Sequence, residues 1–541
     1  METLKPNQKA VIEEALRRDL KGGGLALPLG FGKTRTSICL GLTYNCGPIL
    51  VVASKTLGIT WLSEIPKAFG EDFEFEYLHS DHIKNIETWE PKPNTKLVIT
   101  TPEVLSAVYK SQGFADTFLK YNIPEQFGPT ILEYMTPKSP MFRSYRSGPA
   151  HVYCITWGCL IIDEIQNNNN ILRDKCRSIA CISAKYRWGL SGTMFDEPKP
   201  ERFLGYFTML HIDGPRTLPD VTEHMKTVFK GFRHYIIHRT DNVEFIKKPK
   251  YTEQIVAHNL SDIELKIFDI SREVLSDLNN EVKKLKALGD TDGVRTFSAY
   301  LLAMITYVRQ FLICPIIPIS GIYCDIADFT SRSNLSSRLS TKFRELDLES
   351  WLNSMEALHS SRFKSIMEKI ECHPDERIIV FSCFRTTVSL FQHNIDQIGV
   401  RKTFTISAGM SVPKREQVIR KFEEYPNGIL LLPYSIGAEG LNLQCASVVM
   451  LMDLWWNSAK IQQAIGRVFR PGQEALEIFV YIFVSNTGME NEIIKKNIIK
   501  RDILNELHNG SCQKKVPKMT VRQIIKVIEC SENENLIKSF R

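Results

Sequence analysis

The sequence lacks the marks of a secreted or membrane protein. The N-terminal segment Met1–Pro6 has no apolar signal core, and no apolar run approaches the roughly 18 residues that a membrane-spanning helix needs. The longest such run, Ile478–Val484, is better interpreted as a buried strand. The 13 cysteines are odd in number, scattered and without a C-x-x-C pair, so they indicate neither a disulfide framework nor a zinc knuckle. We therefore expect an intracellular protein in a reducing compartment, with no membrane contact.

The sequence also has little net charge for its length. The net charge is +7 over 541 residues, of which 43% are hydrophobic and 24% are charged. This composition is typical of a globular protein and differs from that of disordered or fibrous chains. The length exceeds what one hydrophobic core supports and suggests several domain-sized units. The mild positive charge allows a polyanionic partner but does not argue for one.

The stretch Leu27–Thr34 has the pattern of a phosphate-binding loop between a strand and a helix. Gly30 and Gly32 allow backbone conformations in which N–H groups point at phosphate oxygens. Lys33 would reach the β- and γ-phosphates, and Thr34 would hold Mg²⁺ through its hydroxyl. The usual pattern has glycine at the first position, where this sequence has leucine. For this motif alone, an ordinary glycine-rich turn is therefore an alternative.

A second element of the same kind of site is an apolar strand that ends in two carboxylates. Cys159–Ile162 is followed by Asp163 and Glu164. Such a pair can supply an aspartate for Mg²⁺ and a glutamate that orients or deprotonates the attacking water. A lone acidic pair is weak evidence, but this one lies downstream of a phosphate loop. Gln8, upstream of that loop, could bind an adenine edge through its carboxamide or could be a surface residue.

Two further runs predict parallel strands. Ile49–Ser54 and Leu97–Thr101 are rich in branched apolar residues, end in polar turns and alternate with helical stretches, as in an α/β sheet. Ligands bind at the carboxyl ends of such strands. Lys55 and Thr101 lie at these ends and could contact a nucleic-acid backbone, although turn and helix-capping roles explain them equally well.

Between about residues 196 and 355 the sequence changes to helix formers and dispersed charge. Ser261 and Glu264 have the spacing of a capping box at the start of one helix. The stretch 319–348 is rich in serine, arginine and aspartate and predicts a loop or a weakly ordered linker. We interpret this region as a helical connector between two larger units.

A second α/β unit is predicted from Ser361 onward. After the apolar strand Ile429–Leu432, Gly437 and Asn442 would let the backbone approach a phosphate chain closely. Trp456 could stack on nucleic acid, although tryptophan is more often simply packed.

Two arginines in the stretch Gln462–Gln473 are candidate phosphate ligands. If this stretch is helical, Arg467 and Arg470 share a face, where their guanidinium groups could meet a γ-phosphate. Such arginines stabilise charge in the transition state without supplying a nucleophile. For an isolated pair at this spacing, two solvated arginines are the plainer alternative.

Taken in order, these motifs resemble the two lobes of Swi/Snf-type double-stranded DNA translocases, a group within helicase superfamily two. The family's phosphate loop commonly reads D-E-M-G-L-G-K-T, and its second lobe has a Q-x-x-G-R-x-x-R-x-G-Q element, to which Gln463–Gln473 is similar. Thr487 and Glu490 also fall at landmarks of that family. One departure is Gln166, where the family usually has histidine. The resemblance spans about residues 4 to 500, nearly the whole chain.

The resemblance implies an α/β fold with two RecA-like parallel-sheet lobes and helical insertions between them. The expected units are an ATP-binding first lobe, a helical insertion with a linker, a second lobe of the helicase C-terminal type and a helical tail. Their expected boundaries are 1–258, 259–355, 356–500 and 501–541.

The resemblance also implies a DNA-stimulated ATPase that uses ATP and Mg²⁺, moves on duplex DNA through backbone contacts and remodels bound complexes. The catalytic residues would be Lys33, Asp163, Glu164, Arg467 and Arg470, with Thr34 and Asp163 as metal ligands. The nucleotide would contact Gln8, Gly30, Gly32, Lys33, Thr34 and Gln463, and the DNA would contact Lys55, Thr101, Gly437, Asn442 and Trp456.

Two other functions stay open at this stage. A strand-separating helicase would share nearly all of these motifs, and a non-catalytic nucleic-acid-binding module would share many of them. No bromodomain-like, chromodomain-like or zinc-binding appendage is apparent, and this compactness resembles the helicases of large DNA viruses. The expected location is therefore the nucleus, a viral replication compartment or the virion, with a transcription or chromatin complex as a partner.

Overall fold

The computed structural model of the chain divides near residue 245 into two compact units. It describes residues 4–28, 30–79, 89–111, 152–192, 194, 199–238, 249–327, 333–344, 346, 348–407, 409–437, 441–455, 458–469, 473–491 and 493–495. No helix in these ranges is both long and apolar enough to cross a membrane.

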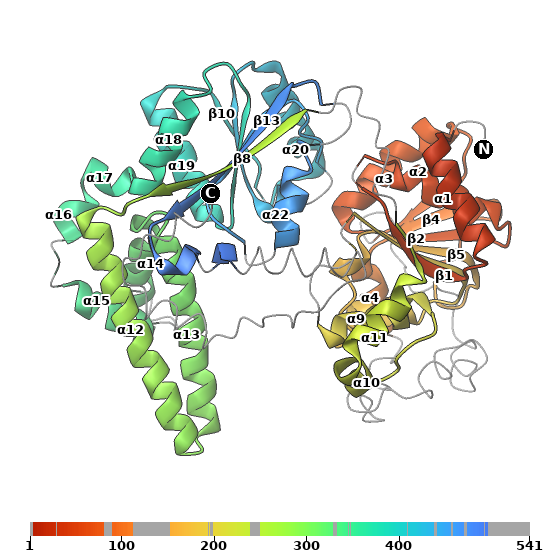
Figure 1. The fold of residues 1–541 in the computed structure, drawn as a ribbon, viewed down its shortest axis with the longest axis horizontal. Coiled ribbons are helices and arrows are strands. Elements are labelled where there is room, and N and C mark those ends of the chain that lie inside the picture. The colour runs from red at the N-terminus through yellow and green to blue at the C-terminus, as the bar shows by residue number, and fades with distance from the viewer. Residues whose placement is uncertain are drawn as a thin grey trace. The chain divides into compact units, whose positions relative to one another are not determined.

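The first unit is built on a seven-stranded parallel sheet with the order β3-β4-β2-β5-β6-β1-β7. Its strands are β1 (Gly22–Ala26), β2 (Ile49–Val52), β3 (Phe75–Leu78), β4 (Leu97–Thr100), β5 (Trp157–Ile162), β6 (Ala184–Ser191) and β7 (Ile236–His238). The helices are α1 (Pro6–Arg17), α2 (Lys33–Thr43), α3 (Lys55–Phe69), α4 (Pro102–Ser111), α8 (Asp174–Ala180), α9 (Pro200–Leu210), α10 (Leu218–Glu223) and α11 (Met225–Arg233). In Figure 1, α1 to α3 lie on one side of this sheet and α4, α9 and α11 on the other.

Two strands show why this sequence forms a sheet covered on both faces. All six residues of β5 are buried, as a continuous apolar run between two helical layers must be. β1 begins with three glycines because its neighbours approach closely. A Cβ at Gly22 would lie 2.4 Å from the carbonyl oxygen of Leu210, and one at Gly23 would lie 2.2 Å from that of Tyr235. The strand that leads into the phosphate loop is therefore held by close backbone packing.

The second unit contains a six-stranded parallel sheet with the order β10-β11-β9-β12-β13-β8. Its strands are β8 (Lys250–His258), β9 (Ile378–Ser382), β10 (Thr403–Thr405), β11 (Ile429–Pro433), β12 (Val448–Leu451) and β13 (Glu477–Ser485). Helices α18 (Ser361–Glu371), α19 (Arg385–Ile398), α20 (Val412–Glu424), α21 (Tyr434–Gly437) and α22 (Ser458–Ile465) accompany it. Two parallel-sheet lobes confirm the predicted fold class.

The division between the units lies earlier than the predicted boundary at 258. The strand β8 precedes that boundary, yet it pairs with β13 along its whole length, from Lys250 opposite Glu477 to His258 opposite Ser485. β8 is an edge strand, and most of its residues are exposed or half-buried. Its sequence therefore carries no apolar pattern that would indicate which sheet it joins.

Helices fill the region between β8 and β9. They are α12 (Asp262–Ala287), α13 (Thr291–Phe311), α14 (Ile316–Ala327), α15 (Ser333–Phe343), α16 (Leu348–Leu352) and α17 (Met355–Leu358). Figure 1 shows α12 and α13 as a long hairpin that extends away from the second sheet. The predicted capping box of Ser261 and Glu264 is present at the start of α12. The predicted helical insertion is therefore found.

The prediction of a loop at 319–348 is wrong, because α14 and α15 occupy most of this stretch. Leu335, Leu339 and Phe343 recur at helical spacing and are buried in the core of the second unit. The surrounding serines and arginines masked this apolar stripe, since composition averages over both faces of a helix.

Candidate nucleotide site

The phosphate loop lies between β1 and α2. Gly30 and Gly32 have φ angles of 78° and 86°, in the left-handed region that favours glycine. Gly32 is the N-cap of α2, so Lys33 is the first residue of that helix. Leu27 is fully buried, and its N–H donates to the carbonyl oxygen of Ser191 at 3.0 Å. Leu27 therefore extends the pairing of β1 with β6. The turn that follows is made by Gly30 and Gly32, whose backbones have positive φ.

Gln8 fastens the start of α1 to this loop. Its side-chain Oε1 accepts from the N–H of Lys5 at 3.0 Å, and its Nε2 donates to the carbonyl oxygen of Phe31 at 2.8 Å. A Cβ at Gly32 would lie 2.3 Å from that Nε2. Gln8 is buried, so the surface alternative is wrong, while its adenine contact stays a prediction.

The acidic pair follows β5, and the Glu164 carboxylate lies beside the amine of Lys33. The Lys33 Nζ is 3.4 Å from Glu164 Oε1, although 131 positions separate the two residues. The indole Nε1 of Trp61 donates to Asp163 Oδ2 at 2.8 Å, and the N–H of Glu164 donates to Asp163 Oδ1 at 3.0 Å. The structure therefore brings together three of the five predicted catalytic residues.

The environment of Asp163 favours a bound cation. Burial and the nearby Glu164 raise the pKa of Asp163 to about 6, whereas Lys33 and the hydrogen bond from Trp61 lower it. Two carboxylates share a largely buried site with one lysine, so a divalent cation would relieve their repulsion. As pH falls through about 6, Asp163 becomes protonated and loses its value as a metal ligand.

These residues fit ATP and Mg²⁺. The loop holds two glycines in the left-handed region, where its backbone N–H groups can turn toward phosphate oxygens, and a side chain at Gly32 would collide with the Gln8 amide. Lys33 would hold phosphate oxygens, and Thr34 with Asp163 would hold the metal. Bound Mg²⁺ would supply positive charge to the phosphate oxygens.

Trp61 is the residue of this site that sequence reasoning missed. It lies on α3 and is almost fully buried, so in the sequence it resembles any core residue of a helix that follows a strand. Only the fold shows that its N–H meets the carboxylate of Asp163, directly after β5. Its one available signal is chemical, because a buried indole usually requires an acceptor.

Trp61→Phe is expected to raise the Mg²⁺ concentration needed for half-maximal ATP hydrolysis by about 10-fold to 100-fold. The reason is that the carboxylate of Asp163, the proposed metal ligand, loses the hydrogen-bond donor that orients it. The hydrogen bond from Trp61 lowers the pKa of Asp163, so its loss raises that pKa, and the acid limb of the variant's activity should move to higher pH. A magnesium titration of ATPase rate at several pH values measures both effects.

Trp157→Phe is the matched control, since the indole of Trp157 is also buried but donates to the carbonyl oxygen of Val152 at 3.1 Å. Equal magnesium dependence in the two variants would refute the role of Trp61.

The predicted DNA contacts of the first unit lie at strand ends, and one of them has a capping role. Thr101 is buried, and its Oγ1 accepts from the N–H of Val104 at 3.2 Å in the first turn of α4. Lys55 is exposed at the first position of α3, directly after Ser54, which caps that helix. The capping alternative thus describes Thr101, and its contact with DNA stays a prediction.

In the second unit, the predicted arginine motif is only partly helical. Gln463 is buried on α22, but this helix ends at Ile465, and Arg467 lies in the turns that follow. The helical condition under which Arg467 and Arg470 would share a face is therefore not met at Arg467, as Gly466 disfavours helix continuation. Arg467 is buried, and Arg470 lies outside the described residues.

The predicted DNA-facing segment of the second unit lies beside this turn. The N–H of Leu443 donates to the carbonyl oxygen of Arg467 at 3.2 Å. Its neighbour Asn442 is exposed, and Gly437 is the last residue of α21. Trp456 lies outside the described residues.

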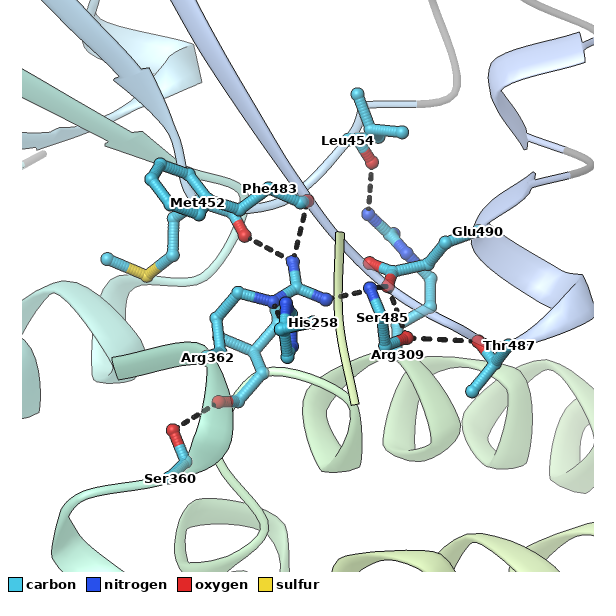
Figure 2. A network of polar contacts seen from close by, with 11 residues as sticks. His258, Arg309, Ser360, Arg362, Met452, Leu454, Phe483, Ser485, Thr487 and Glu490 are labelled. Atoms are coloured by element: carbon cyan, nitrogen blue, oxygen red, sulfur yellow. Dashed lines mark hydrogen bonds and ion pairs between the residues drawn. The ribbon is translucent and has the colours of Figure 1, made fainter. Parts of the chain in front are cut away.

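Arg362 connects the carboxyl ends of three strands of the second sheet (Figure 2). Its Nη1 donates to the carbonyl oxygens of Met452 and Phe483, at 2.6 Å and 2.8 Å, and its Nη2 donates to Glu490 Oε2 at 2.6 Å. Its Nε donates to Nε2 of His258, whose pKa is lowered to about 2 by burial and by the Arg362 charge. Glu490, a predicted family landmark, is therefore one end of a buried ion pair.

We expect Arg362→Met to lower the free energy of unfolding of the second unit by about 3–5 kcal/mol, because it leaves the Glu490 carboxylate buried without its cation. Urea unfolding measures this loss. The double variant Arg362→Met with Glu490→Met should recover part of it, since no lone buried charge remains. A double variant that is as unstable as the sum of the two single variants would contradict the pairing.

The loop between β1 and α2, the acidic pair after β5 and the second parallel-sheet lobe are an arrangement typical of two-lobed helicase-like proteins. The helicase conserved C-terminal domain family matches residues 361–472 of this chain. The chain is 25% identical to the protein named "Putative helicase 172L" of Invertebrate iridescent virus 6, over 88% of this chain and 83% of that protein.

Cellular relatives include DNA repair proteins. The chain is 22% identical to a RAD54-like DNA repair and recombination protein of Drosophila mojavensis, and the match covers 94% of this chain and 64% of that protein. It is 32% identical to RAD54 of Saccharomyces cerevisiae over 27% of its length and 16% of that protein. A solved SWI2/SNF2 ATPase core of Sulfolobus solfataricus in complex with double-stranded DNA aligns over 97% of both chains, with 17% identity and a TM-score of 0.36.

The C-terminal domain match and these relatives support a Swi/Snf-type member of helicase superfamily two, in a compact, viral-like form. The resemblance drawn from the motifs is confirmed. Similarity to this helicase-like group suggests a nucleotide-binding ATPase, and the chain spans only part of the length of its cellular relatives.

Proposed function

We propose that this chain is a DNA-stimulated ATPase that translocates on duplex DNA and remodels protein–DNA or transcription complexes. One observation carries the proposal: the Nζ of Lys33, in the first turn of the phosphate-loop helix α2, lies 3.4 Å from Oε1 of Glu164, in the acidic pair that follows β5. Such a site can hold a nucleotide triphosphate and activate a water beside it.

In the proposed reaction, Lys33 would hold the β- and γ-phosphates, and Asp163 would hold Mg²⁺. Glu164 accepts a proton from the attacking water, whose oxygen bonds to the γ-phosphorus while the bond to the bridging oxygen of ADP breaks. Arg467 and Arg470, from the second lobe, stabilise the charge that develops on the γ-phosphoryl group. Hydrolysis then requires both lobes.

Movement on DNA would follow from the alternation of lobe closure and opening during this cycle. Lys55 is exposed shortly after β2, and Asn442 is exposed between α21 and β12; both could grip the phosphate backbone. Contacts with the DNA phosphates do not distinguish one base from another, so the movement would not depend on the DNA sequence. A nuclear or viral location, suggested by the relatives, would place the protein beside duplex DNA.

A triplex-displacement assay tests the translocation. The full chain with ATP should strip a third strand from a duplex and leave the duplex paired, whereas a strand-separating helicase, the alternative suggested by the iridovirus relative's name, would also unwind a forked oligonucleotide. Failure to displace the third strand despite robust ATP hydrolysis would contradict translocation.

A further inference from the structure

Gln166 is buried behind the proposed catalytic glutamate. It lies in the 3₁₀ turn η2 (Ile165–Asn167), and its Nε2 donates to Glu164 Oε2 at 2.5 Å. The other carboxylate oxygen of Glu164, Oε1, is the one beside Lys33. The Glu164 carboxylate is thus held from two sides, by a cation and by a neutral amide.

The turn that carries Gln166 is fixed from several directions. The Nη1 of Arg202, on α9, donates to the carbonyl oxygen of Gln166 at 2.9 Å and to Asn169 Oδ1 at 3.1 Å. Glu164 begins the turn with φ 45° and ψ 52°, a left-handed conformation that is uncommon outside glycine and gathers at functional sites. The backbone of Gln166 is therefore held in place, and its side-chain amide reaches Glu164 from a fixed position.

Packing alone does not explain a glutamine here. The side chain is 1% exposed, and its Oε1 has no hydrogen-bond partner among the described residues. A buried acceptor without a donor costs stability, and methionine would fill a similar volume without that cost. Buried polar groups that are only half satisfied are typical of functional sites.

We infer that Gln166 is a positioning residue that keeps the Glu164 carboxylate oriented for catalysis, an inference that rests on the proposed function. When Lys33 turns toward bound phosphates, Glu164 Oε1 loses its contact with that amine. The N–H of Gln166 then still holds Oε2, so that Oε1 can turn to the attacking water and accept its proton. A neutral donor does this without adding a charge that would compete for the phosphates.

Steady-state ATP hydrolysis by the full chain with saturating duplex DNA tests this inference. Gln166→Met should lower kcat by about 10-fold to 100-fold, as loss of an orienting partner does, while KM for ATP stays within about threefold. Thermal unfolding should change by no more than a few degrees, since one lost hydrogen bond is offset by removal of an unsatisfied oxygen.

Gln166→His keeps an N–H donor at this position and should retain kcat within about threefold of the unmodified chain, as rescue by a conservative change predicts. Asn167→Ala is the matched control, because Asn167 follows in the same turn with an exposed side chain, and it should hydrolyse ATP normally.

Three results would overturn the inference: normal kcat in Gln166→Met, loss of kcat in Gln166→His equal to that in Gln166→Met, or loss of kcat in Gln166→Met together with a large fall in the unfolding midpoint. A chain that hydrolyses no ATP before any substitution would instead refute the proposed function, so the two failures are distinguishable.

Discussion

Replacing Lys33 with alanine is expected to reduce ATP hydrolysis by on the order of 10³-fold, because the cation that meets the β- and γ-phosphates is removed. The change has a second consequence within the site. Lys33 is a cation that lowers the pKa of Asp163, so its loss raises that pKa further and leaves Glu164 without this ion pair. Both nucleotide binding and turnover should therefore fall.

Phosphate release at saturating ATP and binding of a fluorescent ATP analogue measure the two effects separately. Lys21→Ala is the matched control, because Lys21 is exposed immediately before β1 and its carbonyl oxygen, which the substitution keeps, accepts from the N–H of Arg187. If Lys33→Ala hydrolyses ATP at the rate of the control, the proposal that Lys33 binds the phosphates of ATP is wrong.

Arg467→Ala is expected to reduce hydrolysis by about 10³-fold or more while largely sparing ATP binding, as loss of an arginine finger does. The reason is that a guanidinium which stabilises the transition state contributes little to the ground-state complex. Arg467→Lys should recover only a small part of the rate, since a lysine keeps the charge but lacks the planar fork.

Single-turnover hydrolysis and equilibrium nucleotide binding separate these effects. Arg420→Ala, which removes an exposed arginine on α20 of the same unit, serves as the control. If Arg467→Ala loses nucleotide binding and hydrolysis in equal measure, or loses neither, the cross-lobe role of Arg467 is wrong.

The parts of this site that the sequence predicts are those encoded by short, local patterns. Lys33 is predictable because glycines, a lysine and a threonine stand in a fixed order, and Glu164 because an apolar strand ends in acids. Parallel strands place both at one edge of a sheet, so their meeting follows from the fold class. Leu27 shows the limit of pattern matching, since only the structure explains the missing glycine as a buried strand residue.

The parts that the sequence does not predict depend on contacts between distant elements. Trp61 resembles an ordinary core residue until α3 is placed against β5, where its indole meets Asp163. β8 has the polar exposure of an edge strand, so nothing in its own residues indicates that its partner is β13, more than 200 positions later. Sequence spacing carries no information about such pairings.

ATP hydrolysis by the full chain, measured with and without blunt duplex DNA at saturating Mg²⁺, is the most direct test of this account. The proposed site and its DNA-facing segments predict slow turnover alone and a rate that rises many-fold when duplex DNA is added. Equal rates with and without DNA, or no hydrolysis in either condition, would contradict a DNA-stimulated motor.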